Sequence, residues 1–154
     1  MTNGAERRRD GRISVLWLAR GLGPGGMERL LVTHARLGDA DRFRYLAAYL
    51  TERPRSLRGE LEAAGVGVFS LSDRPLGAAR RLRSLLVKEK VDILHAHSPM
   101  PAAIGRVVAR SLRPRPRLAY TEHNSWACYG AATRLANAAT YPLDDVHLAV
   151  SADA

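Results

Sequence analysis

Apolar and polar positions along this chain alternate in short blocks that predict strands and helices in turn. Six short apolar runs, bounded by glycine, proline or polar residues, have the pattern of buried strands: 13–18, 43–50, 66–71, 91–96, 118–121 and 146–150. Helical patterns lie between them, beginning near residue 25 and covering 57–64, 76–88, 99–112 and 131–141. This alternation predicts an α/β fold, in which a doubly wound, Rossmann-like parallel sheet carries helices on both faces.

The spacing of apolar residues indicates which face of a helix packs on the sheet. In the first helix this face comprises Met27, Leu30, Leu31, His34 and Ala35. We therefore expect His34 to be a hydrogen-bonded histidine of the core. In the segment 99–112 the corresponding residues are Met100, Ile104, Val107, Val108 and Leu112.

The segment 76–88 is a basic amphipathic helix. Its polar arc carries Arg80, Arg81, Ser84 and Lys88. Such an arc is most often a solvated surface, but it also suits peripheral contact with an anionic membrane.

Composition supports one globular domain. The chain has 154 residues, of which 46% are hydrophobic, enough for a single core. Residues 1–12 are polar and arginine-rich, so we expect a disordered basic tail followed by one domain over residues 13–154. The single cysteine, Cys128, excludes an internal disulfide framework, and no apolar run is long enough to span a membrane. These features predict a cytoplasmic protein.

The formal net charge of +9 favours anionic partners, such as nucleotide phosphates, nucleic acid or an acidic membrane surface. Aromatic residues make up only 6% of the chain, so the stacking platforms of a single-strand nucleic-acid binder are sparse. We therefore expect no nucleic-acid partner.

A glycine-rich turn separates the first strand from the first helix. It contains Gly21, Gly23, Gly25 and Gly26. Bare backbone at the start of a helix can present N–H groups to a phosphate, although a plain tight turn also uses glycine. With Gly25 as the cap, Glu28 takes the third helical position and organises the turn. Arg20 and Arg29 flank the turn and add positive charge.

Polar residues also follow the fourth and fifth predicted strands. Ser98, a natural helix cap before Pro99, comes directly after His97, and the next strand runs into Glu122, His123 and Asn124. In a doubly wound sheet of order 3-2-1-4-5, ligands bind at the carboxyl ends of the strands, beside the first and fourth. We therefore expect the glycine turn and both polar segments to meet at one edge.

The histidines of this edge allow two interpretations. His95 and His97 point to the same side of a strand, and together with His123 they could form a zinc site. Alternatively, His97 and His123 form hydrogen bonds with a polar ligand, while His95 is the more buried and structural. Ser98 has no evident base to make it a nucleophile, and capping explains it.

A dinucleotide-binding interpretation also exists. The segment 21–26 satisfies G-x-G-x-x-G, and Glu52 follows the second strand, where such proteins place a ribose-binding carboxylate. This would indicate an NAD-dependent oxidoreductase domain. The proline after the second glycine and the histidines at the later strands argue against it.

Four segments together resemble the N-terminal domain of GT-B glycosyltransferases of family 4. They are GGMER at 25–29, VDILHAHSP at 91–99, TEHN at 121–124 and VHLAVS at 146–151. The resemblance implies two Rossmann-like domains facing a cleft. It also implies transfer of a sugar from a nucleotide-diphosphate donor with retention of configuration, no essential metal and no cofactor beyond the donor.

The resemblance also implies roles for particular residues. Gly25 and Gly26 approach the donor phosphates, and His97 and His123 are the catalytic residues beside the reacting sugar. The residues expected to contact the sugar or the acceptor are Asn124, Ser98 and Glu122.

The second, nucleotide-binding domain of that family is absent from this sequence. We therefore expect the chain to be half of an enzyme that needs a C-terminal or separately encoded domain, with negligible turnover alone. The face that would dock on that domain should make the isolated chain self-associate. The alternatives are the oxidoreductase domain and a non-catalytic binding module.

Overall fold

The computed structural model describes residues 11–71 and 74–151. Its six strands form one all-parallel sheet in the order β3-β2-β1-β4-β5-β6. The strands are β1 (Ile13–Ala19), β2 (Phe43–Tyr49), β3 (Gly67–Ser70), β4 (Ile93–Ala96), β5 (Arg117–Glu122) and β6 (Val146–Ala149). The helices are α1 (Gly26–Leu37), α2 (Arg58–Ala63), α3 (Pro75–Lys88), α4 (Pro99–Arg110) and α5 (Ala131–Thr140), with 3₁₀ turns η1 (Trp126–Cys128) and η2 (Tyr141–Leu143).

The predicted fold class and the alternation of strands and helices are confirmed. Both 3₁₀ turns were absent from the prediction, because each is too short to produce a periodic pattern. Most of the predicted basic tail, residues 1–10, lies outside the described residues.

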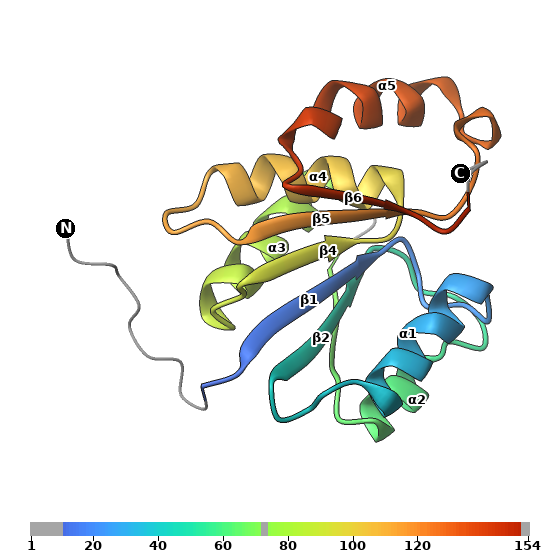
Figure 1. Cartoon of the computed structure of the whole chain (residues 1–154). Coiled ribbons are helices and arrows are strands. Elements are labelled where there is room, and N and C mark those ends of the chain that lie inside the picture. Colours follow the sequence, from blue (N-terminus) through green and yellow to red (C-terminus); the bar gives the residue numbers. More distant parts are fainter. Residues whose placement is uncertain (1–10, 72–73, 152–154) are drawn as a thin grey trace.

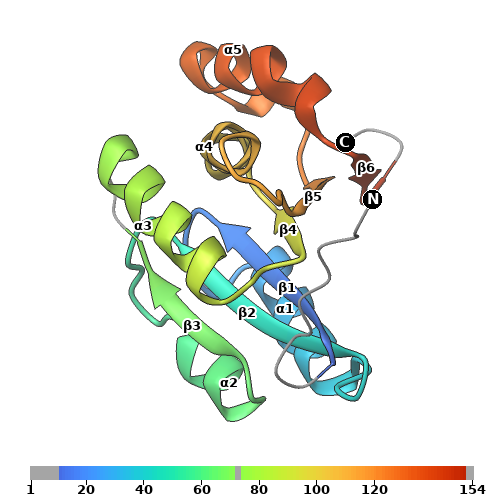
Figure 2. The same cartoon turned by 90° about the vertical axis from the view of Figure 1, so that its left-hand side faces the viewer.

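Helices cover both faces of the sheet (Figures 1 and 2). Helices α1 and α2 lie on one face, whereas α3 and α4 lie on the other and α5 packs against α4. Side chains of β1 alternate between the two cores: Leu16 and Leu18 face α3 and α4, and Val15 and Trp17 face α1 and α2. The near-continuous apolar run of β1 reflects burial on both sides.

Helix α1 is turned somewhat from the predicted orientation. Leu31 and Val32 are its buried residues, whereas Leu30 is 56% exposed. The prediction that His34 belongs to the core is wrong, because this side chain is exposed and packs by its edge on Trp17. The exposed face of α1, which carries Leu30 and His34, borders the part of the sheet that no described helix covers.

That uncovered part is the α1-side face of β5 and β6. Three apolar residues of β6 and its continuation are about half exposed: Val146, Leu148 and Val150. Parallel sheets are normally covered on both faces, so this surface is unusual for the fold.

The predicted basic arc of α3 is only partly free. Arg81 donates a hydrogen bond to the carbonyl of Leu71, whereas Arg80 and Lys88 are exposed. Within residues 11–71 and 74–151, no helix is both long and apolar enough to cross a membrane.

Candidate functional site

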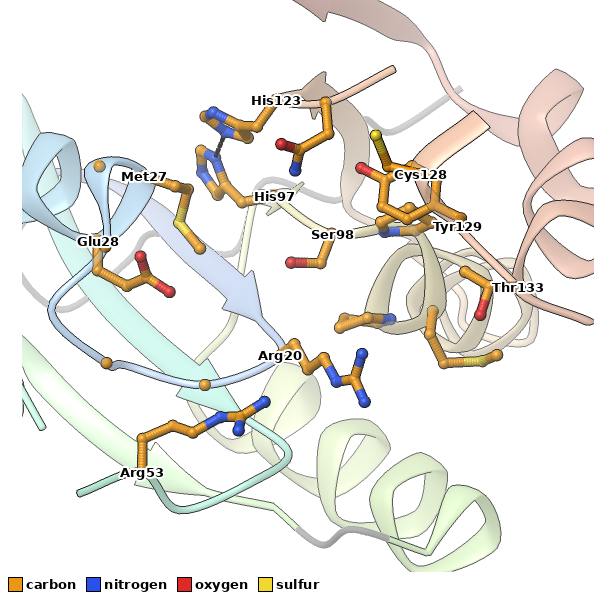
Figure 3. A pocket seen from close by; sticks show the side chains of 18 of the residues that line it. Arg20, Met27, Glu28, Arg53, His97, Ser98, His123, Cys128, Tyr129 and Thr133 are labelled. Carbon is orange, nitrogen blue, oxygen red and sulfur yellow. Dashed lines mark hydrogen bonds between the residues drawn. The ribbon is translucent and has the colours of Figure 1, made fainter. Parts of the chain in front are cut away.

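A cavity of about 930 Å³ opens at the carboxyl ends of β1, β4 and β5 (Figure 3). Its lining includes all but one of the predicted ligand-contacting residues: Gly25, Gly26, His97, Ser98, His123 and Asn124. These residues come from three separate segments of the sequence. The predicted convergence on one edge is confirmed, because the strand order places β1 and β4 side by side.

The glycine turn leaves the start of α1 open. Gly25 is the cap residue, with extended backbone, and Glu28 occupies the third helical position as predicted. Among residues 11–71 and 74–151, no side-chain hydrogen bond caps this helix start, so its first N–H groups remain available to an anion. A Cβ on Gly25 would collide with the carboxylate of Glu28, whereas a Cβ on Gly26 would meet nothing within 4 Å. The Glu28 side chain therefore lies against the turn, as an organising residue would.

Three imidazoles form a row beside this turn. Nδ1 of His97 lies 3.1 Å from Nε2 of His123, and the ring of His95 packs on His97 with centroids 4.1 Å apart. Nε2 of His95 lies 2.7 Å from the hydroxyl oxygen of Thr121. Nitrogens of the three rings are thus used in bonds to one another and to Thr121 instead of converging on one point. Among the described residues, no cluster of three possible ligands could hold a metal ion.

His97 is more buried than His95, which is the reverse of the expected order. His97 is only 9% exposed, and its Nε2 atom is buried without a hydrogen-bond partner in the described part of the chain. His95, expected to be the more buried, is intermediate because it faces the uncovered part of the sheet. The sequence could not reveal this, since strand periodicity gives the side of a residue and not the depth of its cover.

Burial keeps all three imidazoles neutral near pH 7. It lowers the pKa of His97 well below the ordinary value, and it lowers the pKa of His95 to about 4. Burial also lowers the pKa of His123, while the charge of Glu122 acts in the opposite direction. Neutral imidazole has one donor and one acceptor nitrogen, so the row suits hydrogen bonding to uncharged hydroxyl groups.

Ser98 has the cap position of α4, but its hydroxyl makes no capping hydrogen bond. Pro99 is the first helical residue, as predicted, and needs no N–H partner. The Ser98 hydroxyl lines the cavity instead.

Glu122 is the predicted contact residue that the cavity does not include. Its side chain is 4% exposed and accepts hydrogen bonds from the hydroxyls of Tyr120 and Tyr129, both at 2.6 Å. The backbone N–H groups of His123 and Asn124 also donate to it, at 3.1 and 3.4 Å. This carboxylate thus holds the His123–Asn124 segment and Tyr129, and its predicted contact with the sugar stays a prediction.

The arginines expected at the turn separate. Arg20 lines the cavity, but Arg29 points away and pairs with Glu60 at 3.0 Å. Arg53 lines the cavity without having been predicted. Arg53 lies just after β2, the neighbour of β1, and this position in the sequence could have indicated that it lines the site. Glu52 accepts a hydrogen bond from Tyr49 and is not part of the lining, contrary to the dinucleotide interpretation.

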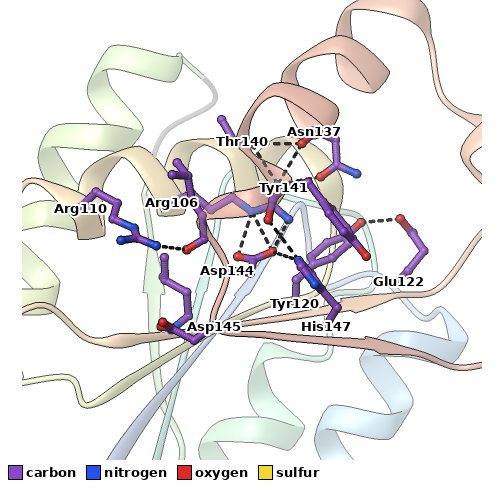
Figure 4. A network of polar contacts seen from close by, with 12 residues as sticks. Arg106, Arg110, Tyr120, Glu122, Asn137, Thr140, Tyr141, Asp144, Asp145 and His147 are labelled. Atoms are coloured by element: carbon purple, nitrogen blue, oxygen red, sulfur yellow. Dashed lines mark hydrogen bonds and ion pairs between the residues drawn. The ribbon is translucent and has the colours of Figure 1, made fainter.

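A buried network behind the site was also missed (Figure 4). Arg106 of α4 is 1% exposed and donates to both carboxylate oxygens of Asp144, with its closest contact at 2.6 Å. Its guanidinium also lies 4.8 Å from the ring of Tyr120. Tyr120 in turn donates to Glu122, so the network joins α4 and the chain before β6 to the segment that carries His123.

Comparison with known families identifies the family of this chain. A family model described as Glycosyltransferase Family 4 matches residues 13–154. A comparison with curated protein sequences finds no significant match.

Several solved structures share this fold at low sequence identity. One is Anabaena Alr3699/HepE in complex with UDP (TM-score 0.63, 20% identity), of which this chain covers 34% while 82% of this chain is matched. Another is MurG of Acinetobacter baumannii (TM-score 0.60, 17% identity), with coverage of 41% of that chain and 89% of this one. A putative UDP-N-acetylglucosamine 2-epimerase of Listeria monocytogenes is also similar (TM-score 0.63, 13% identity, 40% and 92% covered). This chain thus spans less than half the length of these proteins.

Proposed function

The chain belongs to glycosyltransferase family 4, and on that premise we propose that it forms the acceptor-side half of a retaining, metal-independent glycosyltransferase. The donor is a nucleotide-diphosphate sugar, and the acceptor is a glycan, a lipid or a small molecule. One observation carries this proposal: a single cavity joins an uncapped helix start to the His97–His123 pair.

The helix start supplies the electrostatics for the donor phosphates. N–H groups at Gly25 and Gly26 face the leaving diphosphate, and the helix dipole favours its growing negative charge. Glycine at both positions lets the phosphate approach the backbone. Preorganised donors of this kind take the place of a metal ion in this proposal.

The imidazoles contact the sugar. His123, which is partly exposed, lies beside the reacting carbon, and His97 behind it fixes the ring through the 3.1 Å contact. Asn124 and the hydroxyl of Ser98 contact sugar or acceptor hydroxyls from the same rim. Glu122 acts indirectly, because it holds the backbone of His123 and Asn124.

A second Rossmann-like domain completes the site in this proposal. It binds the nucleotide and closes over the cavity, as expected for a GT-B enzyme. The HepE structure that contains UDP has nearly three times the matched length, which is consistent with a further domain in the active protein. We expect no sugar transfer by the isolated chain.

The proposal can be tested by titrating the ¹⁵N-labelled chain with UDP and, separately, with NADH. We expect UDP to shift the amide signals of Gly25, Gly26 and Met27 together with the imidazole signals of His97 and His123. NADH should leave them unchanged. Shifts with NADH but none with UDP at millimolar concentration would favour the oxidoreductase alternative.

A further inference from the structure

We propose that Arg20 and Arg53 form a second anion-binding subsite, which holds a phosphate or carboxylate group of the acceptor. This inference rests on the proposed function, since it assigns a chemical class to the acceptor of the same site. Both arginines line the cavity, and Figure 3 shows both guanidinium groups at one end of it.

The backbone holds the two arginines on loops that are tied together. The carbonyl oxygen of Arg20 accepts hydrogen bonds from the N–H groups of Leu50 and Thr51, at 3.2 and 2.8 Å. A further bond, 2.7 Å long, joins the N–H of Leu57 to the carbonyl of Leu22. The loop after β1 and the loop after β2 therefore form one unit, and the positions of the two side chains are linked.

Gly21 and Gly23, at the start of the glycine turn, leave room for the side chain of Arg53. A Cβ at Gly21 would lie 2.8 Å from Cγ of Arg53, and a Cβ at Gly23 would lie 3.7 Å from the same atom. The absence of side chains at these two glycines thus lets the stem of Arg53 lie across the turn. Gly21 and Gly23 therefore position the Arg53 side chain, whereas Gly25 and Gly26 leave backbone N–H groups accessible at the start of α1.

The charges of this end of the cavity are unbalanced. Among the described residues, neither Arg20 nor Arg53 has an ion-pair partner or a side-chain hydrogen bond, although most other arginines of the chain do. Two guanidinium groups at the same end of a cavity concentrate positive charge there, and an oxyanion bound beside them would offset that charge. Guanidinium also matches phosphate and carboxylate in a bidentate geometry.

The position of the pair favours the acceptor over the donor. Neighbouring strands are about 4.8 Å apart, so the carboxyl ends of β2 and β5 are about 14 Å apart in this strand order. The donor diphosphate is covalently attached to the reacting carbon and must stay near His123 and the start of α1. Arg53, which follows β2, is far from His123, where the reacting carbon lies, and suits an anionic group at the remote end of an acceptor.

The test is an NMR titration of the side-chain Nε–H signals of Arg20 and Arg53 with inorganic phosphate, with and without UDP. We expect phosphate to shift both signals, with the same affinity when UDP is present. Either R20Q or R53Q should weaken phosphate binding about tenfold, because one charge-assisted contact is lost. R83Q, which removes an exposed charge of α3, should not change it.

Three results would overturn this assignment: no shift with phosphate, equal binding by the variants and the wild type, or displacement of phosphate by UDP. The last result would make the arginines part of the donor site. If UDP fails to shift the amide signals of Gly25 and Gly26, the proposed function is contradicted. That result is distinguishable from a failure of the subsite, which is measured at the side chains of Arg20 and Arg53.

Discussion

Nδ1 of His97 lies 3.1 Å from Nε2 of His123, although the two residues are 26 positions apart in the sequence. Because a single proton occupies this contact, the tautomer of one ring determines that of the other. If His97 donates through Nδ1, its buried Nε2 is an acceptor, and Nδ1 of His123 carries the proton. The pair therefore behaves as one hydrogen-bonding unit at the edge of the cavity.

The stability of the protein should fall as pH decreases from about 6.5 to about 4. Burial depresses the folded-state pKa of His95 and His97, so the unfolded chain takes up protons in this range before the folded chain does. Each histidine contributes a loss of up to about 1.4 kcal/mol per pH unit. Urea unfolding at several pH values measures this, and the slope should decrease in the double variant H95Q/H97N. An unchanged slope in that variant would contradict the assignment.

Replacing Glu122 by glutamine should loosen the His123 segment. The amide has only one acceptor oxygen, so at least one of the hydroxyls of Tyr120 and Tyr129 loses its partner. We expect a loss of about 1–3 kcal/mol in unfolding free energy. The imidazole signals of His123 should broaden or shift in NMR spectra. Glu62→Gln, at an exposed position of α2, is the matched control and should leave these signals unchanged.

Replacing Arg106 by methionine should destabilise the chain by about 3–5 kcal/mol, because it leaves the carboxylate of Asp144 buried without its main partner. The double variant R106M/D144L should recover part of this loss, since no unpaired charge remains. Chemical denaturation measures both. The exposed Arg58–Glu62 pair is the control, and R58A should have no measurable effect. A mild effect of R106M alone would show that the network contributes little.

Gly26→Ala should separate folding from ligand binding. The added methyl group meets no atom within 4 Å, so stability should be unchanged or slightly higher. The same methyl group obstructs the approach of a phosphate to the helix start, and we expect UDP affinity to fall about tenfold. Gly59→Ala on α2, also without nearby atoms, should leave UDP affinity unchanged. Full UDP binding by G26A would exclude this contact.

The isolated chain should self-associate through the uncovered face of β6. Leu148 is 50% exposed between Val146 and Val150, and apolar surface of this kind on a parallel sheet favours association. Light scattering at increasing protein concentration should show species larger than a monomer, and L148T should reduce them. A monodisperse monomer for the wild type at all concentrations would argue against the prediction.

Much of the molecule follows from local sequence patterns. The apolar runs predicted the strands, the spacing of apolar residues predicted the helices, and their alternation predicted a parallel sheet with a known strand order. That order alone brings Gly25, His97 and His123 to one edge, because parallel strands present their carboxyl ends together. The site was therefore accessible from the sequence.

Tertiary structure decided how deeply each side chain is buried and what it contacts. Periodicity assigns a residue to one side of a helix or strand, but the segments that bury its side chain are distant in the sequence. Glu122 and Arg106 are buried because Tyr129 and Asp144 fold over them, and His34 is exposed because it borders the part of the sheet, over β5 and β6, that no described helix covers. Charged and polar residues carry no periodic signal of such partners. Their roles became visible only when the chain was folded.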